Sequence, residues 1–224
     1  MKKILKRMLG GILILFVIAI VTLGVTISYD SDCVSPPPVT DGETTMSAVV
    51  QPCYGPPEIL ELVETARPEP DENELLIKIE AAAINPLDWH AMRGSPYLMR
   101  LGSGTGAPND VRFGVDFAGT IEVVGAGVTR FKPGDRVFGG TNGAFAEYTI
   151  RSEESAVAKI PDNVSFEQAA AVPIAALTAL QALRDKGEVK AGQTVLINGA
   201  SGGVGTFAVP IAKSYGAEVS GVCS

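Results

Sequence analysis

The sequence predicts an α/β protein with an N-terminal all-β part and a transmembrane helix ahead of it. Three observations support this fold class. Residues 195–224 follow a strand, glycine turn, helix and strand pattern; residues 46–161 contain many short strands separated by glycine and proline; and residues 8–29 are apolar and uncharged. With 224 residues, of which 46% are hydrophobic, the chain is long enough for one or two folded domains.

The apolar stretch at residues 8–29 follows a basic cluster at residues 2–7. About 20 apolar residues suffice to cross a bilayer as a helix. A cleaved signal peptide is the alternative, but its apolar core is usually about 7 to 15 residues long and ends at small residues. This stretch is longer and ends in Ser28, Tyr29 and Asp30. We therefore expect an uncleaved, single-pass membrane anchor.

The charge distribution predicts an orientation and excludes one class of partner. The basic cluster places the N-terminus in the cytoplasm and the rest of the chain on the far side of the membrane. Beyond residue 29 there are 14 basic and 25 acidic residues, a net charge of −11, which argues against nucleic acid as a partner. Residues 30–45, with three consecutive prolines, are expected to form a linker that separates the membrane from the folded part.

Residues 46–161 are expected to form a barrel-like all-β domain. In residues 74–84 the apolar Leu75, Ile77 and Ile79 alternate with Lys78 and Glu80, as expected of a half-buried strand. Further strands are expected at residues 46–54, 58–66, 115–125, 136–140 and 144–152. Short strands with glycine and proline between them are typical of all-β domains.

After residue 161 the sequence pattern changes from that of strands to that of helices. Ser165 and Gln168 have the spacing of a capping box, so a helix is expected to start there. Two helices are predicted, at residues 166–172 and 174–186, with Pro173 at the break between them.

A glycine cluster at residues 199–205 follows the strand at residues 195–197 and opens the next helix. It consists of Gly199, Ala200, Ser201, Gly202, Gly203, Val204 and Gly205. Such glycines permit a tight turn and a close approach of the backbone to a pyrophosphate at a helix N-terminus. An ordinary tight turn in a parallel sheet is the alternative. A P-loop is excluded because no lysine lies between Lys190 and Lys213.

The end of the second strand predicts the cofactor. NAD-specific folds usually place an Asp or Glu there to bind the ribose 2′-hydroxyl. Residues 221–224 contain no carboxylate, Ser224 can donate to a 2′-phosphate, and Glu218 comes too early in the strand. The sequence therefore predicts NADP (NADPH) as the cofactor.

The chain resembles the zinc-independent, quinone-oxidoreductase-like branch of the medium-chain dehydrogenase/reductase superfamily. The resemblance is carried by AAAINPLDWHAMRG (81–94), GVDFAGTIEVVG (114–125), FKPGDRVFG (131–139), GAFAEYTI (143–150) and NGASGGVGTFAVPIAKSYGAEV (198–219). Met46 resembles the usual start of soluble relatives, so the residues before it are interpreted as an added anchor.

The resemblance implies four parts in the chain. They are a cytoplasmic flank and transmembrane helix (1–29), a proline-rich linker (30–45), a GroES-like catalytic domain (46–164) and the first part of a Rossmann doubly wound domain (165–224). A dinucleotide site is built from two βαβαβ halves, and the sequence stops within the first half. We therefore expect a fragment that does not turn over by itself.

The same resemblance predicts chemistry without zinc. Zinc-dependent members carry a Cys near the position of Asn85, a Gly-His-Glu in place of Gly114-Val115-Asp116, and a lobe of four closely spaced cysteines. This chain has three cysteines, far apart, and one histidine. A tetrahedral zinc site cannot be assembled from that set without unusual ligands. No metal site is expected.

By resemblance, the segment after Ile84 lines the cleft near the nicotinamide and its ribose. The amide of Asn85 could polarise a substrate carbonyl, or Asn85 could be a turn residue before Pro86. Asp88 could bind ribose hydroxyls, or it could be the N-cap of a short helix.

Two candidate proton donors lie further along this segment. His90, the only histidine, could donate a proton near neutral pH or could be a packed or surface residue. Tyr97 lies in a loop that could cover the cleft and is a second candidate donor. Trp89 is expected in the core.

Two functional hypotheses follow. The first is an NAD(P)H-dependent oxidoreductase that transfers hydride to a quinone, an enone or another activated carbonyl. The second is a membrane-tethered nucleotide-binding or interaction protein with the same fold but no turnover. A homodimer is compatible with both. The predicted orientation conflicts with the cytoplasmic supply of reduced nicotinamide nucleotides, so the sequence leaves the side of the membrane open.

Overall fold

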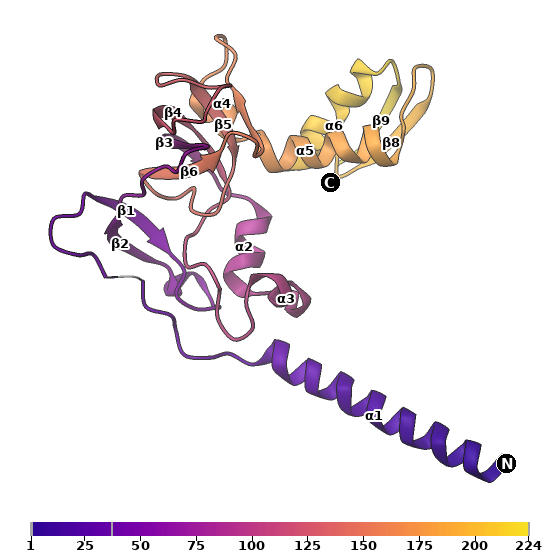
Figure 1. Cartoon of the computed structure of the whole chain (residues 1–224). Helices are drawn as coiled ribbons and strands as arrows, with labels where there is room; N and C mark the ends of the chain where they lie inside the picture. Colours follow the sequence, from indigo (N-terminus) through magenta and orange to yellow (C-terminus); the bar gives the residue numbers. More distant parts are fainter. Residues whose placement is uncertain (1, 37, 224) are drawn as a thin grey trace.

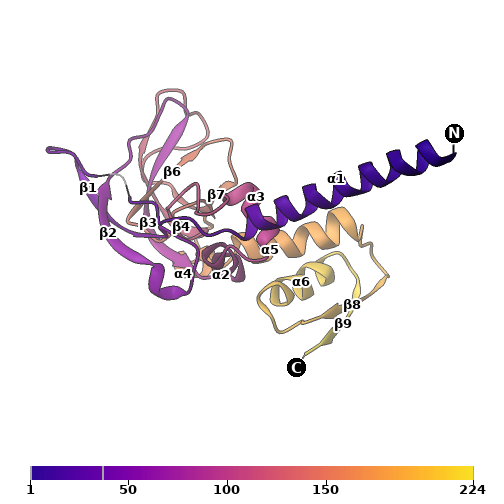
Figure 2. The ribbon, with the colours of Figure 1, turned by 90° about the horizontal axis from the view of Figure 1, so that it is seen from below.

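The computed structural model describes residues 2–36 and 38–223. Helix α1 (Lys2–Ser28) projects from a β-rich part made of strands β1 to β7, with the N-terminus at its far end (Figure 1). Helix α5 (Pro173–Gln181) leads from the β-rich part to a β8–α6–β9 unit that lies beyond it (Figure 2). The predicted α/β fold with an N-terminal all-β part is confirmed.

The β-rich part contains two antiparallel sheets. Strands β1 (Thr45–Val50) and β2 (Glu61–Ala66) form the smaller one, in which Met46 lies opposite Thr65. The larger sheet has the strand order β6-β3-β4-β5-β7. Its strands are β3 (Glu74–Ala83), β4 (Asp116–Val124), β5 (Arg136–Gly140), β6 (Tyr148–Ser152) and β7 (Val157–Lys159). Strand β7 has three residues and was not predicted, since so short a run has no recognisable period.

The core of the larger sheet comes from the inward faces of β3, β4 and β5. Its most buried side chains are Leu75, Ile77, Phe117, Ile121 and Val137. The predicted alternation holds from Ile77 onward, where Lys78 and Glu80 are exposed, whereas Leu75, Leu76 and Ile77 are buried in succession. Burial of such side chains is the main favourable contribution to folding, at roughly 1.5–3 kcal/mol each.

Short helical segments connect these strands. They are η1 (Pro57–Ile59), α2 (Pro86–Arg93), η2 (Tyr97–Met99) and α3 (Arg100–Ser103). Helix α4 (Phe166–Ala170) starts at the predicted capping box, in which the Gln168 N–H donates to Ser165 Oγ (3.2 Å) and the Ser165 N–H donates to Gln168 Oε1 (3.0 Å). Pro173 begins α5 as predicted, and a π-helical turn, η3 (Ala182–Lys186), follows it.

The C-terminal unit has the predicted strand, turn, helix and strand. Strands β8 (Thr194–Asn198) and β9 (Glu218–Val222) are parallel, and α6 (Gly203–Ser214) connects them. Ala208 and Ala212 of α6 are buried against Ile197 of β8 and Leu183 of η3. The glycine turn is thereby fixed at the carboxyl end of β8.

Helix α1 could cross a membrane by its length and composition. Its stretch Gly10–Ser28 has a mean hydropathy of 2.7 over 19 residues, and none of it is buried by the rest of the protein. At about 1.5 Å per residue, this stretch approaches the hydrocarbon thickness of about 30 Å.

The prediction of a free spacer at residues 30–45 is wrong for its first part. The Ser31 N–H donates to the Gly106 carbonyl (3.1 Å), and the Val34 N–H donates to the Pro52 carbonyl (2.9 Å). A disulfide joins Cys33 to Cys53, with the two Cα atoms 4.7 Å apart. The chain is therefore attached to the β-rich part immediately after α1.

Candidate functional site

Two buried carboxyl groups lie at the centre of the candidate site. Asp116 begins β4 and is fully buried, and Asp88 lies in the first turn of α2 with 2% of its surface exposed. Carboxylates are seldom fully buried unless they are paired or hydrogen-bonded. The contacts of this acid pair, Asp88 and Asp116, therefore determine the chemistry of the site.

The acid pair joins three separate elements. One oxygen of Asp116, Oδ2, accepts from Asn85 Nδ2 and from the Ile174 N–H, each at 3.1 Å. Asp88 Oδ2 accepts from the Asn85 N–H at 2.7 Å. Since Asn85 precedes α2 and Ile174 lies in the first turn of α5, the two carboxyl groups hold α2, β4 and α5 together.

Burial makes both carboxyl groups reluctant to ionise. Loss of hydration raises the pKa of Asp116 above its ordinary value, against the lowering effect of the bonds from Ile174 and Asn85. Loss of hydration also raises the pKa of Asp88, and the nearby charge of Asp116 raises it further. The Oδ1 atoms of both are buried without a hydrogen-bond partner among the described residues. Burial therefore opposes the ionisation of both members of the acid pair.

Asn85 and Asp88 lie together, as expected from the sequence, but their local roles differ from those considered. Asn85, not Asp88, is the N-cap of α2, and Asp88 is the third helical residue. Only one hydrogen of the Asn85 amide is needed by Asp116. Asn85 is half-buried, and its Nδ2 also donates a longer hydrogen bond to the Ala83 carbonyl (3.4 Å).

His90 and Tyr97 make contacts of their own, away from the acid pair. His90 Nδ1 lies 2.7 Å from the Ser95 carbonyl oxygen, so this nitrogen carries the proton of that hydrogen bond. The Tyr97 ring is half-exposed and stacks against the guanidinium of Arg100, 4.8 Å from the ring centre. The structure does not bring these two side chains to Asn85 by any recorded contact, and their roles as donors stay predictions.

Trp89 was expected in the core, and this expectation is wrong. Its ring is 46% exposed, packs edge-on against His90 and lies under the guanidinium of Arg93. On an eight-residue helix whose buried residues are Asp88 and Met92, position 89 falls on the outer face.

The glycine turn has the geometry of an anion cradle. Gly199 has φ of +73°, which favours glycine. A Cβ atom on Gly205 would overlap the carbonyl oxygen of Gly199 and the backbone of Ala200, so only glycine fits there. The Thr206 N–H donates to the Gly202 carbonyl (2.9 Å) as the first turn of α6. The N–H groups of the preceding helical residues therefore point out of the helix end, where an anion can bind.

These residues fit the phosphate part of a dinucleotide. Gly202, Gly203, Val204 and Gly205 form the helix start, and Ala200 and Ser201 lie in the turn before it. No hydrogen bond joins this turn to Asn85 or to the acid pair within residues 2–36 and 38–223. Ser224, predicted to bind a 2′-phosphate, lies outside the described residues.

A cavity of about 300 Å³ adjoins the acid pair. Its wall includes Asp88 and Ala91 of α2, Gly102 and Ser103 of α3, and Phe113. The contribution of α3 was not foreseen, because its four residues have no recognisable pattern. Asp116 was also missed as a site residue, although an acidic residue at the start of an apolar strand is a signal that could have identified it.

Metal ligands do not gather in this region. Over the part of the chain that the structure describes, no group of three or more His, Cys, Asp or Glu side chains could hold a metal ion.

Comparison with known proteins identifies related chains. Residues 71–162 match the model of the alcohol dehydrogenase GroES-like domain. A quinone oxidoreductase from Sus scrofa is 40% identical over 183 residues, which cover 80% of this chain and 53% of the relative. The chain thus spans about half the length of such curated relatives.

Solved structures agree with this assignment. The quinone oxidoreductase from Coxiella burnetii has a TM-score of 0.71 and 37% identity, over 81% of this chain and 57% of the other. A mycobacterial protein complexed with NADPH has a TM-score of 0.68 and 34% identity, over 80% and 52% of the respective chains.

Replacement of Asp116 tests the buried carboxyl group. Because its pKa is raised in the folded state, its stabilising contribution is complete below about pH 4 and is lost as the pH rises. The D116N amide oxygen can still accept from Asn85 and Ile174 without ionising. We expect the melting temperature of D116N relative to the unmodified protein to increase from about pH 4 to about pH 7.5 in detergent solution. D116A leaves the partly buried Ile174 N–H without its acceptor, while Asn85 Nδ2 keeps the Ala83 carbonyl, and should cost about 1–3 kcal/mol. Equal losses in D116N and D116A at the higher pH would contradict this account.

Proposed function

The chain belongs to the quinone-oxidoreductase-like branch of the medium-chain dehydrogenase/reductase superfamily, and from this we propose that the whole protein is a membrane-anchored NADPH-dependent reductase of quinones, enones or other activated carbonyls. The observation that carries the proposal is the glycine turn at the start of α6, where only glycine fits at position 205. We also propose the division into a GroES-like domain (46–164) and a Rossmann unit (165–224).

The residues would act by binding and orientation. The N–H groups of Gly203, Val204 and Gly205 would bind the pyrophosphate, together with the turn formed by Ala200 and Ser201. NADPH, when bound, supplies the hydride. The Asn85 amide would exchange its long bond to the Ala83 carbonyl (3.4 Å) for one to the substrate oxygen and stabilise negative charge there, while Asp116 holds the amide in place at 3.1 Å. Asp88 would bind ribose hydroxyls, and His90 or Tyr97 would supply the proton.

The preference for NADPH over NADH rests on the end of β9. Asn198 of β8 pairs with Val222, so β9 ends at the same end of the sheet as the glycine turn. Glu218 pairs with Thr194 at the opposite end of these two strands, which supports the prediction that Glu218 does not bind the ribose. Residues 221–224 contain no carboxylate, so no acidic side chain of this segment would repel a 2′-phosphate.

We propose further that the folded part lies on the side of the membrane away from the cytoplasm. The basic cluster at residues 2–7 supports this orientation. The disulfide between Cys33 and Cys53 supports it independently, because disulfides persist in oxidising compartments. The proposal therefore requires a compartment that oxidises thiols and also contains NADPH.

Activity and cofactor binding are tested together with a variant of the glycine turn. The full-length protein should oxidise NADPH in a saturable, quinone-dependent manner. G205V should lose NADPH affinity and activity by at least about tenfold, because its side chain forces the turn open. K213A, a change of an exposed residue near the other end of α6, should behave like the unmodified protein. Tight NADPH binding without quinone-dependent oxidation would instead favour the binding-protein hypothesis.

The compartment is tested by counting thiols. Of the three cysteines, Cys223 is exposed and unpaired. Protein isolated from membranes in the presence of a maleimide and denatured without reductant should carry one label per chain, and two more after reduction. Three labels before reduction would place the folded part in a reducing compartment and overturn the proposed orientation.

A further inference from the structure

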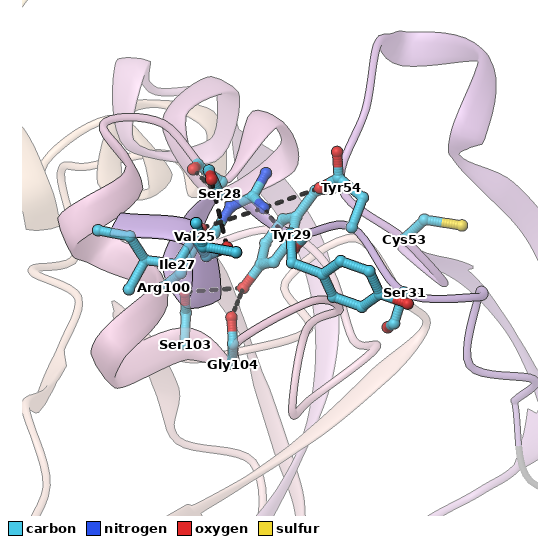
Figure 3. Close-up of polar contacts among 12 residues, drawn as sticks. Val25, Ile27, Ser28, Tyr29, Ser31, Cys53, Tyr54, Arg100, Ser103 and Gly104 are labelled. Atoms are coloured by element: carbon cyan, nitrogen blue, oxygen red, sulfur yellow. Dashed lines mark hydrogen bonds and ion pairs between the residues drawn. The ribbon is translucent and has the colours of Figure 1, made fainter. Parts of the chain in front are cut away.

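The end of α1 is attached to the β-rich part through one buried arginine (Figure 3). Arg100, at the start of α3, is 3% exposed. Its Nη1 donates to the Ile27 carbonyl (3.4 Å), to the Tyr29 carbonyl (3.2 Å) and to Asp30 Oδ1 (2.8 Å). A cationic donor at a helix C-terminus satisfies carbonyl groups that have no partner within the helix. Helix α3 therefore lies beside the last turn of α1.

Two aromatic rings also contact the guanidinium of Arg100. The guanidinium lies 4.4 Å from the ring centre of Tyr54 and 4.8 Å from that of Tyr97. Arg100 Nε donates to the Gly94 carbonyl (2.9 Å), and the Tyr54 hydroxyl donates to the Gly104 carbonyl (2.8 Å). The two ends of the segment from residue 94 to residue 104 are thus bonded to Arg100 and to Tyr54.

The bonds of Arg100 determine how far residues 94–104 lie from the surface of a bilayer that α1 crosses. If the stretch Gly10–Ser28 spans the hydrocarbon, the bilayer surface crosses α1 at its last turn. Arg100 contacts the backbone of that same turn, so η2 and α3 lie at the level of the lipid headgroups.

The residues that α3 and η2 expose there are apolar. Leu98 is 67% exposed and Leu101 is 56% exposed, and they flank the buried Arg100 in the sequence. Tyr97 and Tyr29 are also at least half-exposed at the same junction. Residues 94–108 contain no charged residue except Arg100, in a protein with a net charge of −7. Exposed leucines scattered singly need no explanation, but a charge-free apolar surface continuous with a membrane helix does.

We propose that residues 97–103, together with Tyr29, form a second membrane-contact surface that seats the β-rich part directly on the bilayer. Leucines and tyrosines beside a spanning helix match the interface of a bilayer, where aromatic rings gather and apolar side chains enter the acyl boundary. The inference rests on the proposed membrane span of α1.

The position of this surface deepens the proposed function. Gly102 and Ser103 of α3 line the same cavity as Asp88. A site beside the membrane-contact surface takes its substrate from the bilayer, so the substrate class is a lipid-soluble quinone or enone rather than a water-soluble one.

Tryptophan fluorescence in vesicles tests the contact. The 224-residue chain has one tryptophan, so in this chain W89F provides a silent background for L98W, for L101W as a second probe, and for two controls. The vesicles are phosphatidylcholine with or without brominated acyl chains. Since interfacial segments are buried about 5–10 Å into the headgroup and acyl boundary, the indole introduced by L98W or by L101W should lose about half of its emission to bromine.

The controls separate the two proposals. F16W, within α1, should be strongly quenched, and L62W, at a 77% exposed apolar position on β2, should not be. Quenching at position 16 but at neither 98 nor 101 would overturn the membrane-contact surface while leaving the span intact. No quenching at position 16 would overturn the span itself and the contact surface with it. Blue-shifted but unquenched emission from the L98W variant would show a protein partner on this surface and would also overturn the proposal.

Discussion

The bonds of Arg100 to the last turn of α1 are the constraint on which the arrangement of this protein depends. The end of a helix leaves carbonyl groups without partners, and the buried guanidinium of Arg100 accounts for those of Ile27 and Tyr29 while it also binds Asp30. The disulfide between Cys33 and Cys53 fixes the chain a few residues later. Both attachments lie in the β-rich part, so they fix the distance and orientation of α1 relative to the candidate site. Within the described chain, residues 30–34 are therefore not a flexible spacer.

The acid pair has a corresponding role inside the protein. Through a single oxygen, Asp116 binds Asn85, the N-cap of α2, and Ile174, in the first turn of α5. The raised pKa of both carboxyl groups follows from their burial, and such burial is costly unless the groups are hydrogen-bonded. The same hydrogen bonds orient the Asn85 amide and join α5 to the β-rich part.

Local patterns explain what could be predicted from the sequence. The strands around Leu75 and Ile77, the capping box at Ser165 and the turn at Gly199 each depend on residues close together in the chain, so their periods and spacings were sufficient. The pairing of Cys33 with Cys53, the burial of Arg100 and the bonds of Asp116 to Asn85 and Ile174 join distant segments. No local rule indicates such contacts. The linker and Trp89 were misjudged for the same reason, because composition does not determine where a segment packs.

The central claim, that the folded part is held rigidly at the end of α1, is tested most directly by one distance. Spin labels at V21C in α1 and L62C on β2, in a C223S background that keeps the Cys33–Cys53 disulfide, can be measured by pulsed dipolar spectroscopy in nanodiscs. The attachments through Arg100 and the disulfide predict a single narrow distance distribution. A broad distribution, as expected for a domain on a flexible tether, would contradict the account.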